Sequence, residues 1–178
     1  MDGKKIIFIT GGARSGKSRF ALKLASAISS IRKAYIATAE ALDGEMKERI
    51  EDHKRQRGDE WVTYEEPLSI ANVLEEIEGR YSVILIDCLT LWLSNLMHAG
   101  LNIEIEIEHF ISSLVTCHSS PIYIVSNEVG MGIVPENEMA RRFRDMAGFL
   151  NQKIAEVADE VYMVVAGIPV KIKDKGEI

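Results

Sequence analysis

Short apolar runs alternate along this chain with longer amphipathic stretches. An unbroken apolar run of about four to eight residues is typical of a strand buried on both faces, whereas apolar residues spaced three and four apart indicate a helix. The pattern predicts strands at residues 5–10, 34–38, 61–64, 81–87, 121–127 and 160–166. It predicts helices at residues 18–25, 43–57, 69–77, 89–97, 103–116 and 137–158.

Strands that alternate with helices in this way predict an α/β fold, with a mostly parallel sheet covered by helices on both faces. Gly130, Gly132 and Pro135 interrupt the pattern between the strand at 121–127 and the last helix, so we expect a loop there. No internal repeat, low-complexity segment or linker divides the sequence. We therefore expect a single domain over residues 1–178.

Composition narrows the functional classes. The net charge of −6 argues against general binding to nucleic acid or to a membrane surface. Cys88 and Cys117 have no partner at metal-ligand or C-x-x-C spacing, so we interpret both as reduced, buried thiols. The apolar run near the N-terminus is too short for a signal peptide, and no run approaches the roughly 20 residues that span a bilayer. We expect a cytoplasmic location.

The strongest motif, G-G-A-R-S-G-K-S, lies between the first strand and the first helix and matches the phosphate-binding P-loop at every fixed position. Its residues are Gly11, Gly12, Ala13, Arg14, Ser15, Gly16, Lys17 and Ser18. In such a loop the backbone N–H groups and the helix N-terminus face a phosphate chain. Lys17 would reach the terminal phosphates, and the Ser18 hydroxyl would ligate Mg²⁺. The motif predicts a nucleoside triphosphate, ATP or GTP, as ligand.

Asp87 ends the most apolar strand, at the sheet edge where ligands bind in open α/β folds. In P-loop proteins an acidic residue at this place holds Mg²⁺, directly or through water. The alternative is that Asp87 caps the helix that follows. Asn127 and Glu128, which follow another strand, are weaker candidates at the same edge.

His53 stands out among the four histidines because a basic run follows it. The run Lys54, Arg55, Gln56 and Arg57 could bind a triphosphate and stabilise charge on a transferring phosphoryl group. A histidine can also be the nucleophile of a covalent step. Local chemistry alone favours the simpler interpretation, a solvated basic helix end.

Three further sets of polar residues carry weaker signals. Glu65 and Glu66 precede Pro67 in a predicted loop, where one of them could contact a ribose. The other histidines, His98, His109 and His118, are interpreted as surface or structural residues. The arginines of the last helix, Arg141, Arg142 and Arg144, are interpreted as a solvated face paired with residues such as Glu138 and Asp145.

Taken together, these segments resemble the bifunctional adenosylcobinamide kinase/adenosylcobinamide-phosphate guanylyltransferase family over essentially the whole chain. The matching stretches are T-G-G-A-R-S-G-K-S-R at 10–19, Y-I-A-T at 35–38, E-M at 45–46 with R-I at 49–50 and H-K at 53–54, Trp61, Glu65, D-C-L-T-L-W-L-S-N at 87–95, N-E-V-G-M-G-I-V-P-E-N at 127–137, R-R-F-R-D at 141–145, N-Q at 151–152 and V-V-A-G-I-P at 164–169. The P-loop is shared by many families. The Asn-Glu-Val-Gly stretch combined with the His-Lys pair is far more specific.

The resemblance implies a RecA-like P-loop fold, a homotrimer and two reactions. The first phosphorylates the hydroxyl of adenosylcobinamide from ATP or GTP, and the second transfers GMP from GTP to that phosphate through a guanylylated histidine. His53 matches that histidine, and Lys54, Arg55, Gln56 and Arg57 would help to bind the GTP phosphates. Ala37, Thr38 and Ala39, with Glu65 and Asp87, would complete the nucleotide contacts. Some relatives carry a second histidine where this chain has Asp52.

Two alternatives stay open at the level of sequence. One is a P-loop kinase of another small metabolite without nucleotidyl transfer, which would leave His53 as a surface residue. The other is a nucleotide-driven regulatory or assembly ATPase, which would couple hydrolysis to partner binding.

Overall fold

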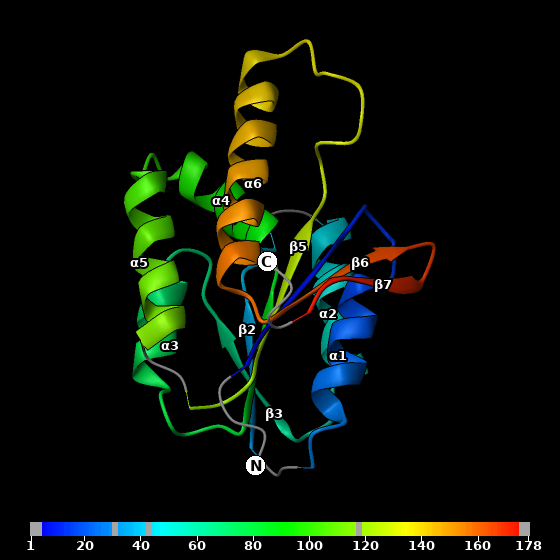
Figure 1. Cartoon of the computed structure of the whole chain (residues 1–178), viewed down its shortest axis with the longest axis vertical. Helices are drawn as coiled ribbons and strands as arrows, with labels where there is room; N and C mark the ends of the chain where they lie inside the picture. The colour runs from blue at the N-terminus through cyan, green and yellow to red at the C-terminus, as the bar shows by residue number, and fades with distance from the viewer. Residues whose placement is uncertain (1–4, 30–31, 42–43, 117–118, 175–178) are drawn as a thin grey trace.

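A computed structural model describes residues 5–29, 32–41, 44–116 and 119–174 (Figure 1). Within the helix at 44–56 the side chains of Glu45, Met46, Arg49, Asp52, His53 and Gln56 lie outside the description. The described residues form one seven-stranded sheet in the order β3-β2-β4-β5-β1-β6-β7. The strands are β1 (Ile6–Gly11), β2 (Lys33–Ala37), β3 (Trp61–Glu65), β4 (Val83–Asp87), β5 (Ile122–Asn127), β6 (Glu160–Val165) and β7 (Ile168–Lys173).

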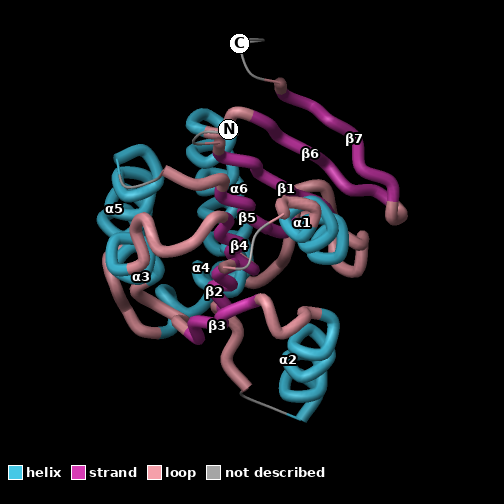
Figure 2. The backbone as a smooth tube through the Cα atoms, turned by 90° about the horizontal axis from the view of Figure 1, so that it is seen from below, coloured by secondary structure: helices cyan, strands magenta, loops and turns pink. Residues whose placement is uncertain are grey.

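The helices are α1 (Lys17–Ser26), α2 (Gly44–Gln56), α3 (Ile70–Glu76), α4 (Leu89–His98), α5 (Ile103–Thr116) and α6 (Glu138–Val157). Helices α3, α4, α5 and α6 cover one face of the sheet, and α1 covers the other (Figure 2). Each predicted helix is present, and the one at 103–116 has the predicted bounds. No helix within the described ranges is long and apolar enough to cross a membrane.

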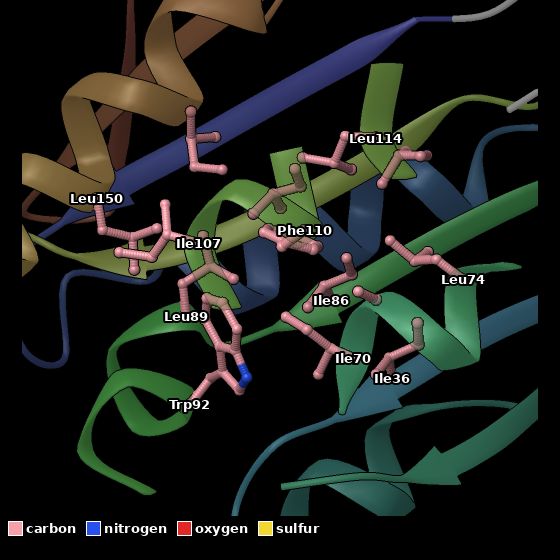
Figure 3. Packing of buried hydrophobic residues seen from close by; sticks show 14 of the residues in the cluster. Ile36, Ile70, Leu74, Ile86, Leu89, Trp92, Ile107, Phe110, Leu114 and Leu150 are labelled. Atoms are coloured by element: carbon pink, nitrogen blue, oxygen red, sulfur yellow. The ribbon is translucent and has the colours of Figure 1, made fainter. Parts of the chain in front are cut away.

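The core lies in two layers, one on each face of the sheet. The larger layer joins inward residues of the strands to α3, α4, α5 and α6, with Trp92 and Phe110 in ring contact at 5.3 Å between centroids (Figure 3). The smaller layer packs Ala21 and Ala25 of α1 on the opposite face, where small side chains let the helix lie close to the strands. Because β1 and β5 are buried on both faces, the sequences of these two strands are almost continuously apolar.

Strands β1 to β6 pair in parallel, as predicted, and β1 lies between β5 and β6. The strand that carries the P-loop and the strand that ends in Asp87 are therefore separated by β5. The predicted P-loop α/β architecture is confirmed.

The strand predicted at 160–166 does not close the fold, because β7 follows it and pairs antiparallel with β6. The turn between them has positive φ at Ala166 (50°) and at Gly167 (81°), the backbone sign that a tight two-residue hairpin requires. Sequence analysis missed β7 because Pro169 lies inside it and its residues are largely exposed. An edge strand tolerates proline, since one side of its backbone has no partner strand.

Candidate nucleotide-binding site

A pocket that is open to solvent lies at the carboxyl edge of the sheet. It is lined by Lys17, Ser18, Tyr35, Ala37, Ala39, Ile50, Lys54, Arg57, Asp87, Cys88, Leu91 and Asn127. These residues come from the start of α1, the ends of β2, β4 and β5, helix α2 and the start of α4. Parallel strands bring their carboxyl ends to one edge, which is why residues so distant in sequence meet here.

The P-loop fits tightly between β1 and α1 because of two glycines. At Gly11 an added Cβ would collide with the backbone oxygen of Val164 on β6. At Gly16 φ is 92°, and the next residue begins α1. The N–H of Ser15 donates to the Gly12 carbonyl at 3.2 Å, so the backbone curls between these two glycines. The loop therefore leads directly into α1, whose first two residues line the pocket, whereas residues 11–16 are not among its lining residues.

Lys17 and Ser18 place side chains in that pocket from the first turn of α1. The Lys17 ammonium donates to the Gly12 carbonyl at 3.1 Å, so the charge lies against the loop although only 6% of the residue is exposed. The Ser15 hydroxyl is buried and makes no hydrogen bond within the described part of the chain. Of the predicted loop residues, Lys17 and Ser18 line the pocket, and Ser15 does not.

Asp87 is not the cap of α4, so that alternative is wrong. The N-cap of α4 is Cys88, and no side chain hydrogen-bonds there. The Asp87 carboxylate instead accepts a hydrogen bond from the Tyr35 hydroxyl at 3.0 Å and lines the pocket. A carboxylate and the Ser18 hydroxyl, which line the same pocket, offer the oxygen ligands that Mg²⁺ prefers. Mg²⁺ in such sites takes only one or two protein ligands besides phosphates. The residues present fit the metal.

Thr38 has a different role from its two neighbours. Its hydroxyl is fully buried, accepts from the Cys88 N–H at 2.8 Å and donates to the Cys88 carbonyl at 2.7 Å. Ala37 and Ala39 line the pocket. Its N–H donates to the Asp87 carbonyl at 3.2 Å, and its carbonyl accepts from the Asn95 side chain at 2.8 Å. Thr38 thus fixes the chain after β2 to the start of α4 and does not line the pocket.

The basic run at the end of α2 divides into distinct positions. Lys54 and Arg57 line the pocket, and Arg57 stacks on the Tyr35 ring with its guanidinium carbon 3.6 Å from the ring centroid. Arg55 is exposed. His53 belongs to α2, but its side chain and that of Gln56 lie outside the described part. The helix that carries His53 therefore ends at the pocket.

The two glutamates before Pro67 are separated by the structure. Glu65 is the last residue of β3, not part of a loop as expected, and its carboxylate forms an ion pair with Lys54. The Glu66 carboxylate accepts from the N–H groups of Leu68 and Ser69 at 2.9 and 2.8 Å, just before α3. Glu66 thus stabilises a helix start, and Glu65 is the better candidate for a nucleotide contact.

Pocket residues that sequence analysis did not single out are Tyr35, Ile50, Cys88 and Leu91. Tyr35 lies inside an apolar strand, where a tyrosine is normally core, so its role is visible only from the hydrogen bond to Asp87. Asn127 was a weak candidate, and it does line the pocket. Cys88 is a buried free thiol, as expected; burial, and then the charge of Asp87, raise its pKa to about 11. Cys117 lies outside the described residues.

His98, His109 and Arg144 match their structural interpretations, whereas Arg141 donates to the Pro135 carbonyl at 3.0 Å. His98 is exposed near the end of α4, and partly buried His109 contacts Glu75 at 3.0 Å. His118 lies outside the described residues. Arg144 pairs with Asp145 at 3.2 Å on α6, as expected.

Two solved structures share the fold of this chain. The flagellar accessory protein FlaH from Methanocaldococcus jannaschii aligns with a TM-score of 0.55 at 13% identity, over 97% of this chain and 80% of that one. An ATPase from the type III secretion system of pathogenic bacteria aligns with a TM-score of 0.60 at 9% identity, over 95% of this chain and 57% of that one. At such low identity these likenesses show the fold alone.

Comparison of the sequence is more specific. The chain is 45% identical to the bifunctional adenosylcobalamin biosynthesis protein CobP of Pseudomonas aeruginosa, over 93% of this chain and 95% of the relative. It is 40% identical to the bifunctional adenosylcobalamin biosynthesis protein CobU of Escherichia coli, over 94% of this chain and 99% of the relative. The family model described as cobinamide kinase / cobinamide phosphate guanyltransferase matches residues 7–172. The chain therefore belongs to the cobinamide kinase / cobinamide phosphate guanyltransferase family.

Proposed function

We propose that this enzyme, a bifunctional kinase and guanylyltransferase, phosphorylates adenosylcobinamide with ATP or GTP and then transfers GMP from GTP to the product through His53. Family membership supports the two activities. The observation that carries the assignment to residues is the shared pocket, in which Lys17, Ser18 and Asp87 face the end of the helix that holds His53. Both steps consume nucleoside triphosphates, so we place the enzyme in the cytoplasm.

In the kinase step, the substrate hydroxyl attacks the γ-phosphorus while the bond to the β-phosphate oxygen breaks and the hydroxyl proton leaves. Such a transfer depends on positioning and charge stabilisation more than on covalent chemistry. The loop N–H groups would hold the phosphates together with Lys17, which lines the pocket. Mg²⁺, held by Ser18 and Asp87, would supply charge neutralisation at the phosphate oxygens.

In the guanylyl step, an imidazole nitrogen of His53 attacks the α-phosphorus of GTP, and pyrophosphate leaves. A phosphate oxygen of adenosylcobinamide phosphate then attacks the same phosphorus, and the P–N bond breaks to give adenosylcobinamide-GDP. A neutral imidazole has the lone pair that this attack requires. Lys54 and Arg57 would stabilise charge on the phosphates, since both line the pocket.

Incubation of the enzyme with labelled GTP and Mg²⁺ tests the route through His53. We expect His53→Ala to lose the GMP label and the adenosylcobinamide-GDP product while retaining kinase activity, because phosphoryl transfer to a hydroxyl needs no covalent histidine. The label on the unaltered enzyme should be acid-labile and alkali-stable, as a phosphoramidate is, and peptide mapping should place it on His53.

His98→Ala is the matched control, since His98 is exposed and its ring contacts the Ser94 carbonyl of its own helix. It should retain the label. A label that persists in His53→Ala, or that maps to another residue, would contradict the assignment to His53. A kinase of another small metabolite would then be the better interpretation. Nucleotide hydrolysis without transfer to cobinamide would instead support the regulatory ATPase.

We further propose that the enzyme is a homotrimer, as the family resemblance implies. The support is an apolar surface on the β6–β7 hairpin, where Val165, Ile168, Val170 and Ile172 are each more than half exposed. Alternate residues of a strand share a face, so Ile168, Val170 and Ile172 form one stripe. Contiguous exposed apolar residues of this kind mark contact surfaces.

A further inference from the structure

Tyr35 occupies an unusual place for a buried tyrosine. Tyr35 lies opposite Leu85 in the pairing of β2 with β4. Leu85 is two residues before Asp87 on β4, and alternate residues of a strand share a face, so the side chains of Tyr35 and Asp87 lie on one face of the sheet. Its hydroxyl reaches along that face and donates to Asp87 Oδ2 at 3.0 Å. The residue is 4% exposed and still contributes to the pocket wall.

The ring of Tyr35 is held from two sides. The Trp61 ring meets it edge-on, with the planes at 86° and the centroids 6.2 Å apart. The Arg57 guanidinium lies over it at 3.6 Å. A guanidinium that stacks through its face keeps its N–H groups at the edge, where they can still bind a phosphate. The direction of the Tyr35 hydroxyl is thus set by one neighbour from β3 and one from the end of α2.

The Tyr35 hydroxyl donates its one hydrogen to the Asp87 carboxylate. A carboxylate has about four acceptor positions, so one hydrogen bond from Tyr35 fixes its orientation and leaves capacity for other ligands.

We propose that Tyr35 is a positioning residue, whose hydroxyl holds the Asp87 carboxylate in the orientation that magnesium-dependent nucleotide binding needs, under a ring clamped by Arg57 from the end of α2. The inference rests on the proposed function, because it takes Asp87 to serve the metal. It adds a physical link between that carboxylate and the helix that carries His53, through one ring and one hydrogen bond.

The test measures binding of a non-hydrolysable GTP analogue by titration calorimetry, with MgCl₂ and with EDTA. The dissociation constant in EDTA divided by the dissociation constant in MgCl₂ is the ratio that reports the magnesium-dependent part of binding. This measurement is separate from both reactions. We expect Tyr35→Phe, which keeps the ring and its stacking, to reduce this ratio about tenfold, the scale of one hydrogen bond to a charged acceptor. The dissociation constant in EDTA should stay close to that of the unaltered enzyme.

Tyr64→Phe is the matched control. Tyr64 lies on the adjacent strand β3, and its hydroxyl also has a hydrogen-bonded partner, the Tyr81 hydroxyl at 2.7 Å, but it is not part of the pocket wall. It should leave the ratio unchanged. If the two variants lower the melting temperature equally and neither changes the ratio, Tyr35 is only a structural residue and the proposal is wrong.

The double variant Tyr35→Phe/Asp87→Asn separates the proposal from the function on which it rests. We expect Asp87→Asn to reduce the ratio and the added Tyr35→Phe to reduce it no further, because Tyr35 acts through Asp87. Additive effects would overturn the positioning role while leaving Asp87 as the metal residue. An unchanged ratio in Asp87→Asn would overturn the metal assignment and the proposal together.

Discussion

At the scale of single residues, two polar side chains at the site are buried and hydrogen-bonded. Lys17, in the pocket wall, is 6% exposed and donates to the Gly12 carbonyl, and Thr38, next to the wall, is fully buried and hydrogen-bonded to the N–H and the carbonyl of Cys88. A buried polar group is costly unless it is hydrogen-bonded, so each of these contacts fixes a position as well as satisfying an atom. These two side chains therefore have little freedom before a nucleotide binds.

Lys17→Ala should abolish both activities, because the described chain has one P-loop and both reactions use a triphosphate. We expect each rate to fall on the order of a hundredfold or more, the usual effect of removing one charge-stabilising donor. Kinase assays and GMP labelling on the same preparation provide the measurement. Normal labelling in this variant would require a second triphosphate site.

At the scale of elements, the β6–β7 hairpin supports the P-loop. The Gly167 N–H, at the hairpin turn, donates to the Ser15 carbonyl at 2.9 Å, and Val164 on β6 lies against Gly11. At the other end of β6, Glu160 joins the hairpin to β1 through Lys5 at 2.6 Å and to β7 through Lys171 at 3.0 Å. The loop that binds phosphate thus depends on how this hairpin is anchored.

Glu160 predicts a pH dependence of stability. Burial raises the pKa of its carboxyl, but hydrogen bonds from Lys5, Lys171 and Tyr162 outweigh that effect and lower the pKa from 4.5 to about 2. A carboxyl with a lower pKa in the folded state contributes stability above about pH 4.5 and loses it as the pH falls toward 2.

We expect Glu160→Gln to reduce the free energy of unfolding at pH 7 by about 1–2 kcal/mol, after allowance for solvent screening of the two partly exposed lysines. Urea titrations from pH 7 to pH 2 should show the difference between variant and unaltered enzyme shrinking below pH 4.5. A difference that stays constant over this range would assign the effect to packing instead of charge.

Local sequence patterns predicted most of the helices and strands and part of the site. The residues and the strand that these patterns missed take their places from contacts between distant parts of the chain. The P-loop and Asp87 were found because a strand, a turn and a helix follow one another in sequence. Tyr35 was not found, since its partner Asp87 lies on another strand and an apolar strand hides a tyrosine. The strand β7 was missed because its place comes from pairing with β6, which a proline and exposed side chains obscure.

At the scale of the whole molecule, the two edges of the sheet differ. Strand β3 forms one edge and β7 the other. The β7 edge carries the apolar stripe of Ile168, Val170 and Ile172, whereas β3 exposes Val62 as its large hydrophobic residue. The proposed assembly should therefore use the hairpin edge.

If the proposed trimer forms through this stripe, Val170→Lys should yield monomers, since a charge in the middle of the stripe would have to be buried without a partner. Sedimentation equilibrium at micromolar concentrations measures the change in mass. Val62→Lys, which places the same charge at the opposite edge, should remain trimeric. A Val170→Lys protein that is still trimeric would place the interface elsewhere.

The central position of β1 has a consequence for synthesis. This strand is made first, yet its two neighbours, β5 and β6, begin at residues 122 and 160. Contacts between residues so far apart in the chain form slowly and late. A chain still emerging from the ribosome therefore cannot complete the surroundings of its phosphate loop until β6 has been made. Nucleotide would then stabilise only chains in which β5 and β6 are present, since a ligand that binds the folded state favours that state alone.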